Sequence, residues 1–537
     1  MKSYYNTLFI YFTLVLFISV TGFETNVFCK EKENSMKVLP QIHVNSITVS
    51  GNTAISDKEL EQFLKKYENS TITFEELQKL RHDLTAFYIS KGYINSGVII
   101  PDQKLENGNI VLKVIEGKLT GVKVENNRYF RSSYVARRLQ SVAGPPLNLN
   151  KIQLMLLRLQ QHQGIKRINA KMSPGIKPGD GILNVKLTEN NPFSIGIRFS
   201  NDRPPSVGEN RAEITLNHIN VTGHGDALYT KFGITRGMDD YDISYHYPIN
   251  SKDTIFKVQY RKSDSTVIEG LFKPLDIDSA SETIGIGFQH PLKWSPNQEF
   301  NLGLIGEHRN NKTFLLGRPF SFSLGAEDGK TRVSVIRFSQ EWMKRCNLQV
   351  AAAKSIFNFG ITAYGATSNV YDVDSQFFSW QGQYQLVRRL GNKGTQMIFK
   401  ANAQITKDQL LPLEKFSVGG TNTVRGYREN LYVRDNGVIG SLEFRIPLKI
   451  CKPCFFSAHW APFVDYGKAW DTRSQSPGSL LSLGIGLRLS CGKFGDYIFK
   501  HPKLINIYYG YDLKNIPSTG EELQDKGIHI EFSTLLF

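Results

Sequence analysis

Two short stretches of the chain contain residues whose types and spacing could do chemistry, and the first is a pair of cysteines. Cys451 and Cys454 have the Cys-x-x-Cys spacing of thiol–disulfide exchange sites. Such a site needs a strand that leads into a helix, and the residues around this pair lack that pattern, so redox catalysis is disfavoured. The chain also contains no phosphate-binding loop, HExxH zinc motif or GxSxG nucleophile motif. We therefore predict that the protein is not an enzyme and has no catalytic residue, metal site or cofactor.

The second stretch, GGTNTVRGYREN over residues 419–430, offers electrostatic chemistry. It places Arg425 inside a run of Gly, Asn and Thr that is typical of a loop. Further along, the run FVDYG alternates so that Asp465 shares one strand face with Phe463 and Gly467. Arg425 is the natural partner for this carboxylate, and an exposed loop without a partner is the alternative. The residues predicted to hold the loop against the strand that carries Asp465 are Val424, Arg425, Gly426, Tyr427, Phe463, Asp465 and Gly467.

The start of the chain has the pattern of a secretory signal. Lys2 precedes an apolar run from Leu8 to Val20, and we predict a signal peptide over residues 1–29 that is removed on export. A retained anchor helix is the alternative, although the run is short for a bilayer. An exported chain reaches an oxidising compartment, where cysteines form disulfides more often than they bind metal. Nucleic acid is not an expected partner there.

A repeat follows the signal. The stretch ITVSGN from Ile47 is echoed 75 residues later by VKVENN from Val122. We predict two copies of one small α+β unit over residues 41–117 and 118–190, each in the order strand, helix, helix, strand, strand. The second helix of the first copy is predicted to bury Leu77, Leu80, Leu84, Phe87 and Tyr88 on one face.

Charge divides unevenly between the two units. Residues 41–117 hold 8 Lys and Arg against 10 Asp and Glu, a net charge of −2, whereas residues 118–190 hold 13 against 3, a net charge of +10. A surface this basic attracts an acidic or polar client segment, and a solvated face or attraction to anionic lipid headgroups is the alternative. The basic face predicted to bind a client consists of Arg128, Arg131, Arg137 and Arg138.

Beyond Pro192 the sequence changes to short alternating segments divided by Gly, Asn, Asp and Pro. A soluble β-sandwich would also alternate, but a stretch of 346 residues would need several such domains, and no linker or repeat marks them. A transmembrane barrel over residues 192–537 explains the whole stretch, with about 16 antiparallel strands at about 22 residues for each strand and its turn. A carboxylate such as Asp465 at bilayer depth must then face the lumen.

The number of strands after the Arg425 loop places it relative to the membrane. Five strands are predicted beyond residue 430, so if the last strand ends in the periplasm, the loop lies on the outer side. By the same count Cys451, Cys454 and Cys491 fall in neighbouring periplasmic turns, where a disulfide among them is allowed. The other cysteine beyond the signal is Cys346.

Four stretches of the sequence resemble the two-partner secretion transporters, the TpsB or ShlB/FhaC/HecB group, which are relatives of the BamA-type barrel assembly proteins. They are FYISKGYINSGVIIPDQ with GNIVLKVIEGKL in the first unit, NHINVTGHGDAL from Asn217, VRGY from Val424 and FVDYG from Phe463. Together they span nearly the whole mature chain. The first stretch is characteristic of the transporter group, whereas the last two are shared across the superfamily.

The resemblance implies that the two units are periplasmic POTRA domains, that the rest is a 16-stranded outer-membrane β-barrel, and that residues 411–432 form a loop folded into the lumen. It also implies export of an unfolded haemolysin- or adhesin-type exoprotein from the periplasm to the cell surface. The expected partners are this exoprotein and outer-membrane lipid, with periplasmic chaperones as further candidates. A BamA/TamA-type barrel assembly factor is the alternative, and a passive solute porin is a weaker one.

The sequence departs from the transporter group near its start. Members often carry a pore-plugging helix and a linker before the first POTRA domain, but only about a dozen residues separate the predicted signal from Ile42. We therefore expect no plug helix, which would leave the inward loop as the main obstruction in the lumen. The string SNDRPPSVGENR from Ser200 also stands where many members have a DNxG-type string.

Overall fold

The computed structural model describes residues 41–105, 107–270, 272–368, 373–448, 456–473, 477–491, 503–514, 516 and 520–536. The predicted signal peptide, Cys451 and Cys454 lie outside these residues, and so does the side chain of Cys491. The disulfide among these three cysteines therefore stays a prediction. Within the described residues, Cys346 is exposed and has a free thiol.

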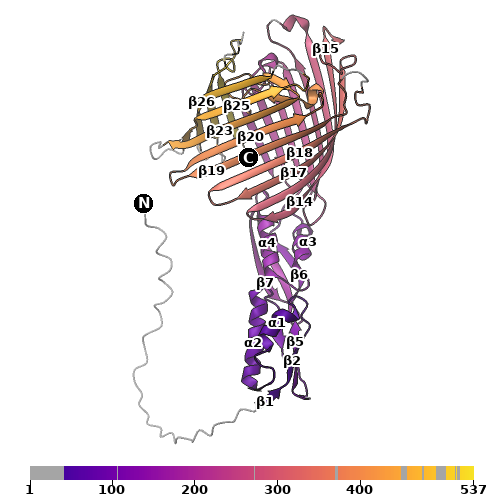
Figure 1. Cartoon of the computed structure of the whole chain (residues 1–537), viewed down its shortest axis with the longest axis vertical. Helices are drawn as coiled ribbons and strands as arrows, with labels where there is room; N and C mark the ends of the chain where they lie inside the picture. The colour runs from indigo at the N-terminus through magenta and orange to yellow at the C-terminus, as the bar shows by residue number, and fades with distance from the viewer. Residues whose placement is uncertain are drawn as a thin grey trace.

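The described chain forms a column of two α+β units that stands below a wide β-barrel (Figure 1). The first unit consists of β1 (Gln41–Val44), β2 (Ser46–Ser50), α1 (Asp57–Leu64), β3 (Ser70–Thr73), α2 (Phe74–Ser90), β4 (Gly97–Ile99) and β5 (Asn109–Ile115). Strand β5 lies between β2 and β4, and the short strands β1 and β3 pair with each other. Side chains from both helices and from β2 and β5 form one apolar core.

Helix α2 shows how the sequence builds this unit. Its N-cap, Thr73, accepts a hydrogen bond from the Glu76 amide, while the Glu76 carboxylate accepts one from the Thr73 amide. This capping box satisfies amides that the first turn of the helix leaves free. One face of the helix is buried as predicted, with Phe87 packed at its edge; the buried residues are Leu77, Leu80, Leu84 and Tyr88.

The second unit repeats the first and joins it without a linker. It consists of β6 (Lys118–Glu125), α3 (Ser132–Ala143), α4 (Leu149–Gln160), β7 (Ile165–Pro174) and β8 (Asp180–Glu189), with β8 between β6 and β7. Across the joint, the amide of Leu147 donates to the carbonyl of Gly117 at 2.6 Å and that of Leu149 donates to Gly92 at 2.8 Å. Within the described residues, no helix is long and apolar enough to cross a membrane.

The barrel is a closed antiparallel sheet of 16 strands, as predicted. Its strands are β9 (Phe193–Ser200), β10 (Arg211–His218), β11 (Ala227–Ile234), β12 (Met238–Pro248), β13 (Ile255–Thr266), β14 (Ile277–Ser295), β15 (Gln298–Leu315), β17 (Lys330–Arg345), β18 (Gln349–Ile361), β19 (Phe378–Leu390), β20 (Thr395–Thr406), β23 (Asn436–Leu448), β24 (Phe456–Trp460), β25 (Phe463–Trp470), β26 (Gly478–Cys491), β27 (Lys503–Asp512) and β28 (Ile528–Leu535). Segments β24 and β25 both pair with β23 and β26 and make up one crossing. The two-residue strand β16 (Arg318–Pro319) pairs with the end of β15. Pairing of β28 with β9 closes the cylinder.

Alternate residues of each strand face lipid and lumen. On β14 the outward side chains Ile284, Ile286 and Phe288 are about half exposed, at 48 %, 52 % and 50 %. On the inner side, by contrast, Glu307 of β15 and Asp465 of β25 are buried. An apolar outer band with buried charges on the inner face is the arrangement that a barrel in lipid requires.

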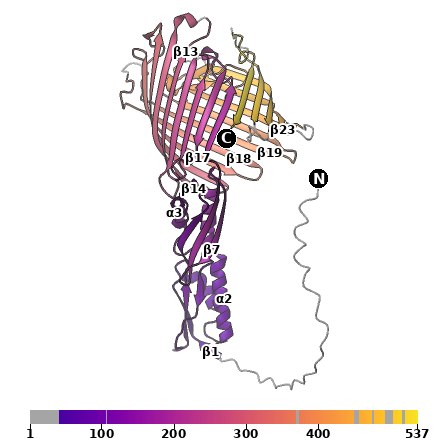
Figure 2. The same cartoon turned by 180° about the vertical axis from the view of Figure 1, so that it is seen from behind.

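The second unit is docked on one rim of the barrel, where the column meets the strands in Figure 2. Residues 190–192 are the whole connection between β8 and β9. Asp253, in the turn between β12 and β13, contacts Arg138 of α3 and Arg158 of α4, each at 2.6 Å. The joint therefore combines a short connection with buried charge pairing.

Candidate functional site in the barrel lumen

The segment between β20 and β23 enters the barrel from the end opposite the α+β units. Five barrel crossings follow it, which agrees with the strand count that placed the loop on the outer side. A 3-10 turn, η3 (Pro412–Glu414), begins the segment, and its two limbs pair as β21 (Phe416–Val418) and β22 (Tyr432–Arg434). We call residues 407–435 the inner loop; the predicted loop, 411–432, lies within it.

Arg425, at the tip of the inner loop, makes three hydrogen bonds to one carboxylate of the wall. Its Nε lies 2.8 Å from Oδ2 of Asp465, its Nη2 lies 2.9 Å from Oδ1, and its main-chain amide donates to Oδ2 at 3.1 Å. The two side chains are 7 % and 0 % exposed. Because a bidentate guanidinium–carboxylate pair fixes orientation as well as distance, the tip has one defined position against β25.

A second carboxylate and two aromatic rings complete the surroundings of Arg425. Its Nη1 lies 2.6 Å from Oε2 of Glu443 on β23. The guanidinium carbon lies 3.6 Å from the centre of the Phe463 ring and 4.7 Å from that of Tyr508. Arg445 balances the second carboxylate, with its Nε 2.8 Å from Oε1 of Glu443. Aromatic faces stabilise a desolvated cation that also has anionic partners.

Sequence reasoning missed several groups that complete this site. Ser441 and Glu443 alternate on one face of β23, so the rule that placed Asp465 inward could have found them. Ser441 donates to Oδ1 of Asp465 at 2.6 Å. His529 of β28 accepts a hydrogen bond from the amide of Gly426 at 3.0 Å. The sequence near His529 holds no comparable signal, because its role depends on which strands meet when the barrel closes.

The other predicted residues pack the tip against the wall. Val424 is fully buried in an apolar cluster that includes Val418. The Tyr427 hydroxyl donates to the carbonyl of Leu481 on β26 at 2.8 Å. A Cβ atom at Gly467 of β25 would meet the Val418 side chain and lie 2.7 Å from Cγ2 of Val424. A glycine at this wall position is therefore what allows the loop to approach so closely.

The descending limb of the inner loop is held by the outer segments of the barrel. Arg428 forms an ion pair with Asp525, and its Nη1 lies 2.8 Å from Oε1 of Glu269. The amide of Glu429 donates to the side chain of Gln524 at 2.9 Å. The loop is thus held at its tip by the wall and along its return by the segments that precede β14 and β28.

The structure removes one residue, Arg138, from the predicted client-binding face on the second unit. Arg138 is only 5 % exposed and contacts Asp253 of the barrel turn. The Nε of Arg131 donates to the carbonyl of Thr222 in the turn between β10 and β11 at 3.0 Å. These two arginines therefore contact the barrel rim, where an acidic turn and free carbonyls attract them. Arg131 nevertheless stays exposed, as do the other two residues of the predicted face, Arg128 and Arg137.

Comparison with known proteins assigns this architecture to a family. The model of the haemolysin secretion/activation protein family ShlB/FhaC/HecB matches residues 179–489, more than half of the chain. The chain belongs to this family. A model of the ShlB-type POTRA domain matches residues 42–117, which are the first α+β unit. We call the two units POTRA 1 and POTRA 2.

Curated relatives of the chain are outer-membrane transporters. It is 26 % identical over 404 residues to the outer membrane transporter CdiB of Dickeya dadantii (strain 3937), covering 73 % of this chain and 70 % of that protein. It is 22 % identical over 473 residues to the heme/hemopexin transporter protein HuxB of Haemophilus influenzae (strain 86-028NP), covering 83 % of this chain and 80 % of that protein.

Solved structures share the fold. CdiB from Escherichia coli has a TM-score of 0.68 at 18 % identity, over 94 % of this chain and 92 % of that chain. BamA from Haemophilus ducreyi lacking POTRA domains 1–3 has a TM-score of 0.54 at 15 % identity, over 92 % and 100 %. The likeness to BamA is at the level of the fold alone. As a member of the ShlB/FhaC/HecB family, the chain is an outer-membrane transporter with periplasmic POTRA domains that exports a partner protein by two-partner secretion.

Proposed function

We propose that this transporter exports an unfolded haemolysin- or adhesin-type exoprotein through the lumen of its own barrel, and that the docked inner loop defines the closed state of that lumen. The observation that carries the proposal is the buried pairing of Arg425 with Asp465, which fixes the tip of the loop inside the barrel. The pair positions a segment and performs no covalent chemistry. We accordingly propose that the protein is not an enzyme.

The energetics of this pair suit a closed state that persists until the client displaces it. An exposed arginine–carboxylate contact contributes about 0–1 kcal/mol, whereas removing one partner of a desolvated pair costs about 3–5 kcal/mol. With exposures of 7 % and 0 %, Arg425 and Asp465 belong to the second class. A loop held this way stays docked in thermal motion and is released when other contacts replace those it loses.

The periplasmic column offers the client a path to the barrel. In POTRA 2, β7 lies at an edge of its sheet, and an extended client can add to such an edge by main-chain hydrogen bonds. Arg128, Arg131 and Arg137 stay exposed near the rim and suit an acidic client segment. Lipid around the outer apolar band and periplasmic chaperones are further partners in this proposal, and folding outside the cell would supply the energy of export.

Deletion of the chain tests this function. We expect the partner exoprotein to disappear from the medium and to return when the wild-type chain is supplied, while unrelated outer-membrane barrels stay at their normal levels. If all outer-membrane barrels decline together, the protein is an assembly factor. If the exoprotein stays in the medium after deletion, the export function assigned here is wrong.

A further inference from the structure

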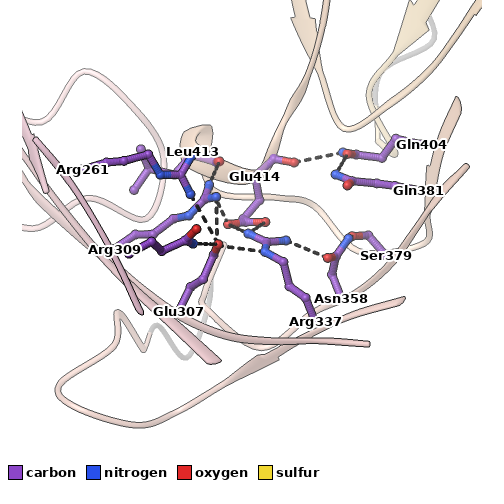
Figure 3. A network of polar contacts seen from close by, with 11 residues as sticks. Arg261, Glu307, Arg309, Arg337, Asn358, Ser379, Gln381, Gln404, Leu413 and Glu414 are labelled. Carbon is purple, nitrogen blue, oxygen red and sulfur yellow. Dashed lines mark hydrogen bonds and ion pairs between the residues drawn. The ribbon is translucent and has the colours of Figure 1, made fainter. Parts of the chain in front are cut away.

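A second buried ion cluster holds the inner loop at a place far from its tip. We call residues 410–415 the shoulder of the loop. Glu414, in η3, has a side chain that is 2 % exposed. Its carboxylate oxygens lie 2.8 and 2.9 Å from Nη2 of Arg337 on β17, and one lies 3.2 Å from Nη1 of Arg309 on β15 (Figure 3).

The wall side of this cluster is built to receive the loop. Glu307 of β15 accepts from Nε of Arg337 at 2.9 Å and from Nη2 of Arg309 at 3.0 Å. The Nη1 of Arg337 donates to the side chain of Asn358 on β18 at 2.7 Å. With these partners fixed, the free edge of each guanidinium points at Glu414, as Figure 3 shows.

Main-chain contacts at the shoulder repeat the same attachment. Arg309 Nη1 also donates to the carbonyl of Leu413 at 2.8 Å, and the side-chain Nε2 of Gln404 on β20 donates to the carbonyl of Glu414 at 2.9 Å. The barrel wall therefore binds both the charged side chain of Glu414 and the backbone of the shoulder. A chance contact between an exposed glutamate and these arginines would not also bring the carbonyls of Leu413 and Glu414 to the same wall.

Apolar packing points to the same docked position. The inward residues Val333 and Val335 of β17 are 0 % and 1 % exposed, in one cluster with Leu410 and Leu411 of the shoulder. The interior of a transmembrane barrel is ordinarily polar, so bare inward valines would be unfavourable in a wet lumen. The shoulder covers them.

The tip and the shoulder of the loop are attached to different parts of the wall. The tip contacts β23 and β25 to β28, whereas Leu413 and Glu414 of the shoulder contact β15, β17 and β20. Lys415, at the end of the shoulder, pairs with Asp471 just beyond β25 at 3.1 Å. On the periplasmic side of the shoulder, strands β15 and β17 to β20 line a cavity of about 430 Å³. Its polar lining consists of amide side chains, among them Asn301, Gln383, Asn402 and, from the loop, Asn422, and of the charged side chains Glu299, Glu341, Lys354 and Lys400. The loop thus bridges the lumen, with its shoulder above this cavity.

We propose that the shoulder is a second closure of the pore: the Glu414–Arg337–Arg309 cluster holds the loop across the lumen on the outer side of this polar cavity, which receives the client as an extended polypeptide in transit. This proposal rests on the proposed function. Amide side chains suit such an occupant because each one both donates and accepts, as the peptide groups of an extended chain do. Export then requires detachment of the shoulder from β15 and β17 in addition to release of the tip.

Conductance without a client tests the closure. Purified full-length protein in planar lipid bilayers should conduct several-fold more current as Glu414→Gln than as wild type. Glu531→Gln is the matched control, because Glu531 also faces the lumen, from β28, and forms an ion pair with Arg198 at 2.8 Å, but within the described residues contacts neither the inner loop nor the cavity. We expect its current to equal that of the wild type. Heat-modifiable migration in gels verifies that each barrel has assembled.

An unchanged current in Glu414→Gln, or an equal increase in Glu531→Gln, overturns the closure. Hydrogen exchange on the wild-type protein gives an independent test that needs no variant. The main-chain amides of Leu410, Glu414 and Lys415, which are hydrogen-bonded in the docked shoulder, should exchange slowly, and exchange as rapid as in an exposed loop also overturns the closure. Neither measurement uses the client, so a failure of the closure can be told apart from a failure of the export function, which the deletion experiment tests.

Cross-linking tests the occupant of the cavity. A photo-cross-linking residue at position 383 should capture an exoprotein arrested in transit, whereas the same residue at position 217, on β10 across the barrel, should capture several-fold less. Equal capture at the two positions would show that the client does not follow this part of the wall.

Discussion

Gly426 of the inner loop and Gly510 of β27 lie backbone against backbone. A Cβ atom at Gly426 would lie 2.8 Å from the carbonyl oxygen of Gly510, and one at Gly510 would lie 2.6 Å from the amide nitrogen of Gly426. Such distances are shorter than carbon–oxygen and carbon–nitrogen contacts allow. The position of the charged tip therefore depends on two glycines in segments that are far apart in the chain.

Substitution of Gly510 by alanine should displace the tip and sharply reduce secretion, because overpacking of this kind costs about 1–3 kcal/mol. Gly440→Ala is the control, since a Cβ atom there on β23 would meet nothing within 4 Å. The exoprotein in the medium is measured by immunoblot at equal levels of barrel in the membrane. Equal secretion by the two variants would contradict this account of the contact.

Arg425→Ala should abolish or sharply reduce secretion while the barrel still reaches the outer membrane. The change leaves Asp465, which is 0 % exposed, without its cation, at a cost of about 3–5 kcal/mol for the docked state. Arg425→Lys should retain part of the activity, because it keeps the charge but cannot form the bidentate contact. Normal secretion by Arg425→Ala would remove the role proposed for this residue.

The parts of the fold that follow local rules could be predicted from the sequence. Period-two alternation gives the strands, and the exclusion of charge from lipid turns Asp465 inward. A loop arginine flanked by glycines is then its natural partner, and the structure places the two within 2.8 Å. The relation of Leu77, Leu80 and Leu84 to one helix face is equally local, because it depends only on the helical repeat.

The parts that depend on distant pairing could not be predicted. The ring of Tyr508 reaches Arg425 only because β27 lies beside the loop once the cylinder has closed. Whether the basic helix face of POTRA 2 is free depends on a turn 115 residues further along, where Asp253 meets Arg138. Charge counting over residues 118–190 could show that the unit is basic, but not which of its arginines would be used to join it to the barrel.

Asp253→Asn should loosen POTRA 2 from the barrel rim. The substitution leaves Arg138 and Arg158 without their anionic partner, and asparagine tolerates the positive φ of 60° at this turn. Limited proteolysis of the full-length protein should then cleave between POTRA 2 and the barrel several-fold faster. Asp276→Asn is the control, because Asp276 also has a positive φ, of 43°, but lies beyond the outer end of β13. The protease should cleave this variant at the wild-type rate, and equal rates of cleavage in the two variants would contradict this role for Asp253.

Acidification should weaken POTRA 2 and its contact with the rim through His162. Burial lowers the pKa of this imidazole below its usual value, although a contact between Nε2 and the carbonyl of Gly225, at 3.3 Å, opposes the shift. The unfolded chain therefore takes up a proton first, at about pH 6.5, so stability is retained above that pH and lost as the pH falls toward the lower folded pKa. Thermal unfolding of the full-length protein between pH 7.5 and pH 5 measures this loss, which His162→Gln should reduce. An identical pH dependence in that variant would assign the effect to other groups.

The connection at residues 190–192 links the periplasmic column to one particular strand. That strand, β9, is also one of the two that close the cylinder, and it meets β28 through only five residue pairs, from Ser200 with Glu531 to Gly196 with Leu535. A pulling force applied to the column is therefore delivered first to the weakest edge of the barrel. In a single-molecule stretching experiment, we expect this edge to yield before any other pair of neighbouring strands.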